Sequence, residues 1–184
     1  DTKLMMANAA RPILDRLAKR MQCVVQLGIF ENDMVTYLVK SGPSAGDLFT
    51  KVGMQLEAYC SGIGKVLLAH LPEDARSEYL RAGPFIALTE RTITDPDLLG
   101  IELAQVAGQG YAIDDEEIAL GVRCVGAPIV DAEGKVRGSI SVAGPAYRLT
   151  MHRLELLGPE VALAARRIGQ QIAVSRAVAA DDGA

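Results

Sequence analysis

The chain has 184 residues, of which 49% are hydrophobic and 23% are charged. This length is typical of one domain, and this composition excludes a disordered or low-complexity chain. A formal net charge of -4, no Trp and 4% aromatic residues provide neither the positive charge nor the stacking surface with which proteins bind nucleic acid.

The sequence lacks the features of a secreted, disulfide-rich or zinc-binding protein. It contains no apolar run of about 18 residues and no hydrophobic signal segment near its start, which favours a cytoplasmic location. Its three cysteines form no CxxC motif, and it has only two histidines. This set argues against a disulfide framework and a structural zinc site, and we expect no metal and no cofactor.

Apolar spacing and turn residues predict the elements of the first half of the chain. Pro12 predicts a helix start, because the residue before a proline disfavours helical geometry. Residues 1–10 would then be the end of a helix that begins upstream. The elements that follow are a β-hairpin at 23–30 and 34–40, a loop at 41–47, a short strand at 54–58, a helix from the turn 61–65 to His70, and a helix at 73–82.

The second half of the chain predicts a helix, three strands and a long final helix. Asp95 and Pro96 have the residue types of a helix N-cap and first position. The predicted segments are a strand or extended segment at 85–94, a helix at 95–108, strands at 111–113, 122–130 and 135–143, a helix from 151 to 176 kinked at Gly158-Pro159, and a frayed tail at 177–184. Strands that follow one another in sequence favour antiparallel pairing, and hence an α+β fold rather than a Rossmann sheet.

The turn Ser61-Gly62-Ile63-Gly64-Lys65 is the first candidate site. At a helix start, free N–H groups and the positive end of the helix dipole would face an anion. The turn matches neither a P-loop nor the GxGxxG fingerprint. Glycines that only let the helix pack closely against the sheet are an equally good interpretation.

Asp114 is the second candidate, because it directly follows Ile113 and is the best placed of the acidic run 114–117 to point inward. The rest of the run is typical of a solvated face. Cys124, His70 and Asp114 also contain the residue types of a nucleophilic triad. A hydrolase that uses Cys124 or Ser61 is therefore an alternative function, although both histidines lie at apolar helix ends and the GxSxG motif is absent. We expect no enzymatic activity.

The hairpin after residue 122 carries the third candidate group. A two-residue turn at Glu133-Gly134 would set Cys124 opposite Ala143, on the sheet face that carries Ser141. A three-residue loop would separate these residues onto opposite faces. The sequence leaves both registers open.

Three stretches between residues 61 and 149 carry a resemblance to a known family, and the resemblance covers nearly the whole chain. They are SGIGKVLLA at 61–69, Gly110-Tyr111 with DDEE at 114–117 and GVRCVGAP at 121–128, and SISVAGPA at 139–146 with Arg148-Leu149. Together they resemble the C-terminal effector-binding domain of IclR-family bacterial transcription regulators. The resemblance implies a GAF-like (profilin-like) antiparallel sheet flanked by helices on both faces. It places the end of a linker helix at 1–10, the effector-binding domain at 11–176 and a disordered tail at 177–184.

The same resemblance implies that a small organic acid binds this domain and modulates operator binding by an N-terminal winged helix-turn-helix domain, in a dimer or tetramer. A GAF-like signalling module with a different output domain is a further alternative. The implied effector site comprises the backbone N–H groups of Gly62 and Ile63, polar contacts from Asp114, Cys124 and Ser141, the neighbouring Ala143, and apolar walls from Leu48, Leu56 and Val122.

Two departures from the family pattern bear on the implied effector. Ala143 stands where many relatives have a serine, and Ile63 stands where relatives often have a small residue. Both changes make the site less polar. They favour an apolar acid, such as an aromatic one, over a two-carbon or three-carbon oxoacid.

Overall fold

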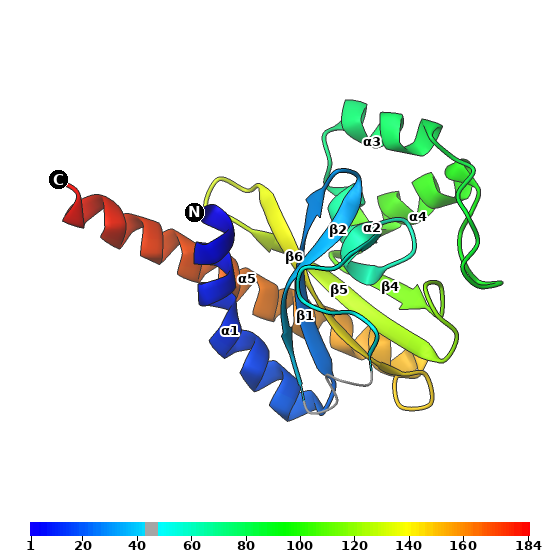
Figure 1. Ribbon diagram of the computed structural model, residues 1–184, viewed down its shortest axis with the longest axis horizontal. Coiled ribbons are helices and arrows are strands. Elements are labelled where there is room, and N and C mark those ends of the chain that lie inside the picture. Colours follow the sequence, from blue (N-terminus) through cyan, green and yellow to red (C-terminus); the bar gives the residue numbers. More distant parts are fainter. Residues whose placement is uncertain (43–47) are drawn as a thin grey trace.

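The computed structural model describes residues 1–42 and 48–184 and shows an antiparallel six-stranded sheet with helices on both faces (Figure 1). The strands are β1 (Val24–Glu31), β2 (Met34–Ser41), β3 (Gln55–Glu57), β4 (Ala112–Asp115), β5 (Val122–Val130) and β6 (Val136–Pro145). Their order across the sheet is β3-β2-β1-β6-β5-β4. The predicted α+β class and the hairpin of β1 and β2 are confirmed.

Two long helices, α1 (Thr2–Met21) and α5 (Met151–Asp182), cover one face of the sheet (blue and orange to red in Figure 1). Successive side chains of a strand point to opposite faces, so every second residue of β1, β5 and β6 faces these helices. The buried residues at these positions are Val25, Leu27, Ile29, Val125, Ala127, Ile129, Ile140 and Val142. None of the described helices is long and apolar enough to cross a membrane.

The other face is covered by α2 (Gly62–Ala69), onto which α4 (Pro96–Gln109) packs, with α3 (Glu73–Arg81) beside α4. All eight residues of α2 are buried, as expected for a helix enclosed on every side. A Cβ on Gly126 of β5 would lie 2.8 Å from the backbone carbon of Gly62. The glycines therefore do let α2 rest directly on the sheet.

The predicted helix start at Pro12 is wrong, because α1 runs unbroken from Thr2 to Met21 with Pro12 inside it. Met6 and Ala10 before the proline are buried in the same core as Leu14 after it. Packing on both sides of Pro12 thus maintains the helix, although proline lacks the N–H for one helical hydrogen bond.

Three further boundaries differ from the sequence prediction or lie outside the described residues. Helix α5 continues to Asp182 instead of ending near 176, through a segment rich in the good helix former alanine. The segment 85–94 forms turns and no strand. Of the predicted loop at 41–47, residues 43–47 lie outside the described residues.

The register of β5 and β6 sets Cys124 opposite Ala143, but a two-residue turn does not produce it. The N–H of Asp131 donates to the carbonyl of Lys135 at 2.9 Å, so the loop is longer. A register shift between Ile129 and Val130 compensates for the extra residue. Cys124 and Ala143 therefore share a face even though the loop is of the longer kind.

Candidate functional site

The strand register gathers the candidate polar residues on the sheet face beneath the start of α2. Asp114, Cys124 and Ala143 are paired in one row across β4, β5 and β6. In the next row, Ser141 lies between Gly126 of β5 and Gln26 of β1. These rows bring side chains from distant parts of the sequence to one surface.

A cavity of about 30 Å³ lies between this surface, the first turn of α2 and residues 48–50. Eight of the nine predicted effector-site residues line it: Gly62, Ile63, Asp114, Cys124, Ser141, Ala143, Leu48 and Val122. Leu56 does not line it, and instead packs half-buried against the core around α2. Since a water molecule needs roughly 10–15 Å³ of such space, the cavity is large enough for a water molecule but too small for an aromatic ring.

Ser61 of the candidate turn also lines the cavity, and sequence reasoning missed the rest of the lining, which comprises Gln26, Tyr37, Phe49, Thr50 and Ile118. Gln26 is 3% exposed between the fully buried Val25 and Leu27 of the opposite face. The hydroxyl of Thr50 donates to Gln26 Oε1 at 2.5 Å. The sequence did show Gln26 as a lone polar residue in an apolar strand, which could have marked it as part of a buried site. With Gln26 and Thr50, this wall of the cavity is more polar than the sequence predicted.

Asp114 is the one acid among the described residues that line the cavity, and it is 1% exposed. Its Oδ1 accepts the backbone N–H of Glu117 at 2.8 Å, and its Oδ2 lies 3.7 Å from Cys124 Sγ. Burial raises the pKa of Asp114 to about 7, and the nearby Glu117 carboxylate acts in the same direction, against the Glu117 N–H and Lys65. The carboxyl group can therefore exchange a proton near neutral pH.

Comparison with known proteins identifies the family of this chain. The family model described as "Bacterial transcriptional regulator IclR C-terminal" matches residues 2–170. The chain belongs to the IclR family. Its α+β sheet is thus the GAF-like fold of IclR C-terminal domains, as the sequence resemblance implied.

Relatives and solved structures support this assignment. The transcriptional regulator BhcR of Paracoccus denitrificans is 37% identical over 160 residues, which are 86% of this chain and 57% of BhcR. The crystal structure of Thermotoga maritima IclR is 30% identical with a TM-score of 0.85, covering 91% of this chain and 68% of that one. An IclR homolog from Microbacterium hydrocarbonoxydans, complexed with 4-hydroxybenzoate, is 26% identical with a TM-score of 0.83, covering 94% of this chain and 70% of that one. The chain therefore spans a little over half of the length of BhcR.

The names of the relatives denote transcriptional regulators, a non-enzymatic role, as the sequence predicted. The geometry of this IclR domain also separates His70 from the other two residues of the alternative triad, Cys124 and Asp114. His70 follows the far end of α2, where its Nδ1 lies 2.8 Å from the carbonyl of Val66. Burial raises the pKa of Cys124 well above its ordinary value, so this thiol remains protonated and unreactive.

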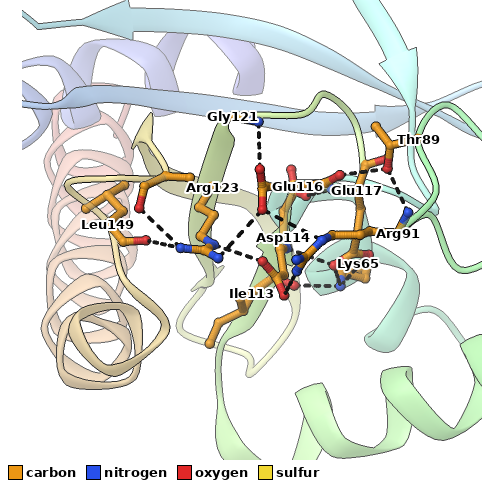
Figure 2. Close-up of polar contacts among 12 residues, drawn as sticks. Lys65, Thr89, Arg91, Ile113, Asp114, Glu116, Glu117, Gly121, Arg123 and Leu149 are labelled. Atoms are coloured by element: carbon orange, nitrogen blue, oxygen red, sulfur yellow. Dashed lines mark hydrogen bonds and ion pairs between the residues drawn. The ribbon is translucent and has the colours of Figure 1, made fainter.

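A buried ion pair supports the wall of the cavity from behind (Figure 2). Lys65 of α2 is fully buried, and its Nζ donates to both carboxylate oxygens of Glu117 at 2.9 and 3.0 Å and to the carbonyl of Ile113 at 2.6 Å. Although burial favours the neutral amine, Glu117 and Glu102 raise the pKa of Lys65 above its ordinary value. The loop that carries Asp114 is thus fixed to α2 by a charged contact that the sequence analysis did not identify.

Arginines secure the outer side of the same loop. Arg123 Nε and Arg91 Nη1 contact Asp115 at 2.8 and 2.9 Å, and both arginines lie within 4 Å of Glu116 (Figure 2). Glu116 has a left-handed backbone, with φ of 56°, and its carboxylate accepts the N–H of Gly121 at 2.8 Å. These contacts hold the turn that brings Ile118 to the cavity.

Proposed function

We propose that this chain is the effector-binding domain of an IclR-type transcription regulator and that a small organic acid binds between α2 and the sheet. The convergence of a helix N-terminus and buried polar side chains on one cavity carries the proposal. The first N–H groups of a helix lack partners within it. At α2 the hydroxyl of Ser61 satisfies the N–H of Gly64, while Gly62 and Ile63 line the cavity and are placed to receive a carboxylate.

The remaining lining suits an acid with an apolar body. Leu48, Phe49, Ile118 and Val122 supply apolar surface, and the polar groups are few, which is the usual composition of a ligand site. A ligand with an aromatic ring exceeds the present volume, so the wall formed by Leu48 and Phe49 must move outward to admit it. The 4-hydroxybenzoate held by the Microbacterium hydrocarbonoxydans homolog makes an aromatic acid the first candidate.

Binding of the acid would change the affinity of the whole regulator for DNA, which an N-terminal winged helix-turn-helix domain would contact in the cytoplasm. For this coupling, the acid must bind one conformation of the regulator more tightly than another. The full regulator would act as a dimer or tetramer.

Thermal unfolding with a panel of benzoate, 4-hydroxybenzoate, glyoxylate and pyruvate tests the proposal. An acid present at a hundred times its Kd stabilises the folded state by about 2.7 kcal/mol, which raises Tm by roughly 5–10 °C at this chain length. We expect this shift with the aromatic acids. Stabilisation by glyoxylate or pyruvate alone would contradict the aromatic class, and stabilisation by none would contradict acid binding.

Two cysteine variants locate the binding site within the protein. Cys124→Ala changes the cavity wall, and we expect a smaller ligand-induced Tm shift. Cys23→Ala removes an equally buried thiol from the core beneath α1, and we expect it to keep the full shift. Equal shifts in both variants would remove Cys124 from the site.

A further inference from the structure

We infer that Gln26 is a specificity-determining residue of this cavity and selects monocarboxylic acids that carry a hydroxyl or carbonyl group opposite the carboxylate. The inference rests on the proposed function, since it assigns the second polar end of the same site. Neither the family resemblance nor the sequence patterns pointed to this residue.

The side chain of Gln26 is buried but only half paired. Its Oε1 accepts the hydroxyl hydrogen of Thr50, whereas its amide nitrogen has no hydrogen bond to any described residue. The cavity is the space that Gln26 lines. An acceptor on a ligand in this cavity could take a hydrogen bond from the amide nitrogen of Gln26.

The sheet register places Gln26 at the opposite end of the cavity from the start of α2. Gln26 pairs with Ser141, and Ser141 pairs with Gly126, on which Gly62 rests. From Gly126 to Gln26 is two inter-strand spacings, or about 10 Å between backbones. Ser141, which is 3% exposed, lies midway along this line. An acid bound at Gly62 and Ile63 must therefore extend over Ser141 before a second group meets Gln26, and a ring substituted at opposite ends has this shape.

The charges around Gln26 determine which second group fits. Gln26 is neutral and offers N–H donors, so it suits an uncharged acceptor such as a hydroxyl or carbonyl oxygen. The nearest cation on the same wall is Lys40, but its Nζ donates to the carbonyl of Leu48 at 2.9 Å and to that of Thr50. Lys40 is not among the cavity-lining residues. A second carboxylate would thus meet no cationic donor among the cavity-lining residues, and its desolvation would be compensated less well than that of a hydroxyl or carbonyl group.

Calorimetric titration of the wild type and Gln26→Leu with 4-hydroxybenzoate and benzoate tests the inference. One net hydrogen bond predicts that the wild type binds 4-hydroxybenzoate roughly three- to tenfold more tightly than benzoate. In Gln26→Leu the ratio should fall to about one, because the hydroxy acid loses affinity and benzoate does not. Gln55→Leu is the matched control: Gln55 is exposed on β3 and its amide bonds to Thr36 outside the cavity, so this variant should keep the wild-type ratio.

Thr50→Val provides a second test if Gln26→Leu fails to fold, because it keeps Gln26 and removes only the contact that orients its amide. We expect the ratio to decrease there as well. Equal weakening of both acids in the variants, or no preference in the wild type, would overturn the role of Gln26 and leave the proposed function intact. If neither acid binds the wild type, the inference and the aromatic class of effector are both overturned.

Discussion

Substitution of the buried Lys65 tests how the wall of the cavity is held. In Lys65→Met the methionine side chain fills most of the space of the lysine methylene groups, so packing around α2 changes little. The ammonium group is lost, however, and Glu117, whose side chain is 6% exposed, remains without its partner. The carbonyl of Ile113 loses its hydrogen bond to Lys65 as well.

Breaking a buried ion pair by removing one partner costs about 3–5 kcal/mol. A domain of this kind has about 5–15 kcal/mol of total stability, so the variant should lose a large part of it. At this chain length each kcal/mol corresponds to roughly 2–4 °C in Tm, which predicts a decrease of about 6–20 °C. Protonation of Glu117 limits the loss, since burial already raises the pKa of this carboxyl group.

Urea unfolding of Lys65→Met, Glu117→Gln and the double variant measures the coupling directly. The double variant should lose less than the sum of the single variants, because neither charge is then left alone. Lys3→Met is the control, since Lys3 and Glu31 form an exposed pair with side chains 52% and 30% accessible. Its effect should stay below about 1 kcal/mol. A loss for Lys65→Met as small as that of Lys3→Met would refute the structural role of the buried pair.

Three further substitutions test the packing of α2, the buried acid and the continuous first helix. Gly126→Ala should destabilise the protein by about 1–3 kcal/mol, because the new Cβ would strike the backbone of Gly62. The control Gly108→Ala in α4 places its Cβ in open space and should stabilise the protein by up to about 1 kcal/mol. Equal stabilities of the two variants in urea unfolding would contradict the close approach of α2 to the sheet. The pKa of Asp114 in the folded protein, about 7, exceeds its value in the unfolded chain, so the folded protein binds an extra proton. The free energy of unfolding of the wild type should therefore fall as pH rises from about 4 to 7, by up to about 1.4 kcal/mol per pH unit. Unfolding measured between pH 4 and 8 should show a weaker pH dependence for Asp114→Asn, and an unchanged pH dependence would exclude Asp114 as its cause. Pro12→Ala restores a helical hydrogen bond at an exposed position of α1 and should stabilise by about 1–3 kcal/mol, which a lower unfolding midpoint would disprove.

The predicted cavity residues came from the family resemblance, whereas alternation along a strand decides which residues share a face once the register is known. Once Cys124 is opposite Ala143, the face of Ser141 and Asp114 follows from the two-residue period. The loop at Asp131 could not be predicted, since a bulge elsewhere in the strand restores the register that the loop alone would shift. Pro12 misled because its local preference is outweighed by burial on both sides of it.

Gln26 and Lys65 remained hidden for a different reason. Each is a single polar residue in an apolar segment. Such a residue either points to solvent or forms hydrogen bonds inside the protein, and the sequence alone does not show whether a buried partner is present. Lys65 finds Glu117 from the loop after β4, and Gln26 finds Thr50. Both partners are distant in sequence, so neither pair forms a motif with a recognisable spacing.

The walls of the cavity differ in how firmly they are held, and this difference bears on selection of the ligand. On the α2 side, Asp114 is fixed by Glu117, Glu117 by Lys65, and the adjoining turn by two arginines. Such second contacts preorganise polar groups and reduce the cost of orienting them when a ligand binds. On the opposite side, residues 48–50 are held by hydrogen bonds from Lys40 and by the bond from Thr50 to Gln26. The bond from Thr50 to Gln26 Oε1 orients the Gln26 amide, so that its nitrogen can donate to a ligand. Size and polarity are therefore recognised at the same point, because only a ligand long enough to reach Gln26 can accept this hydrogen bond.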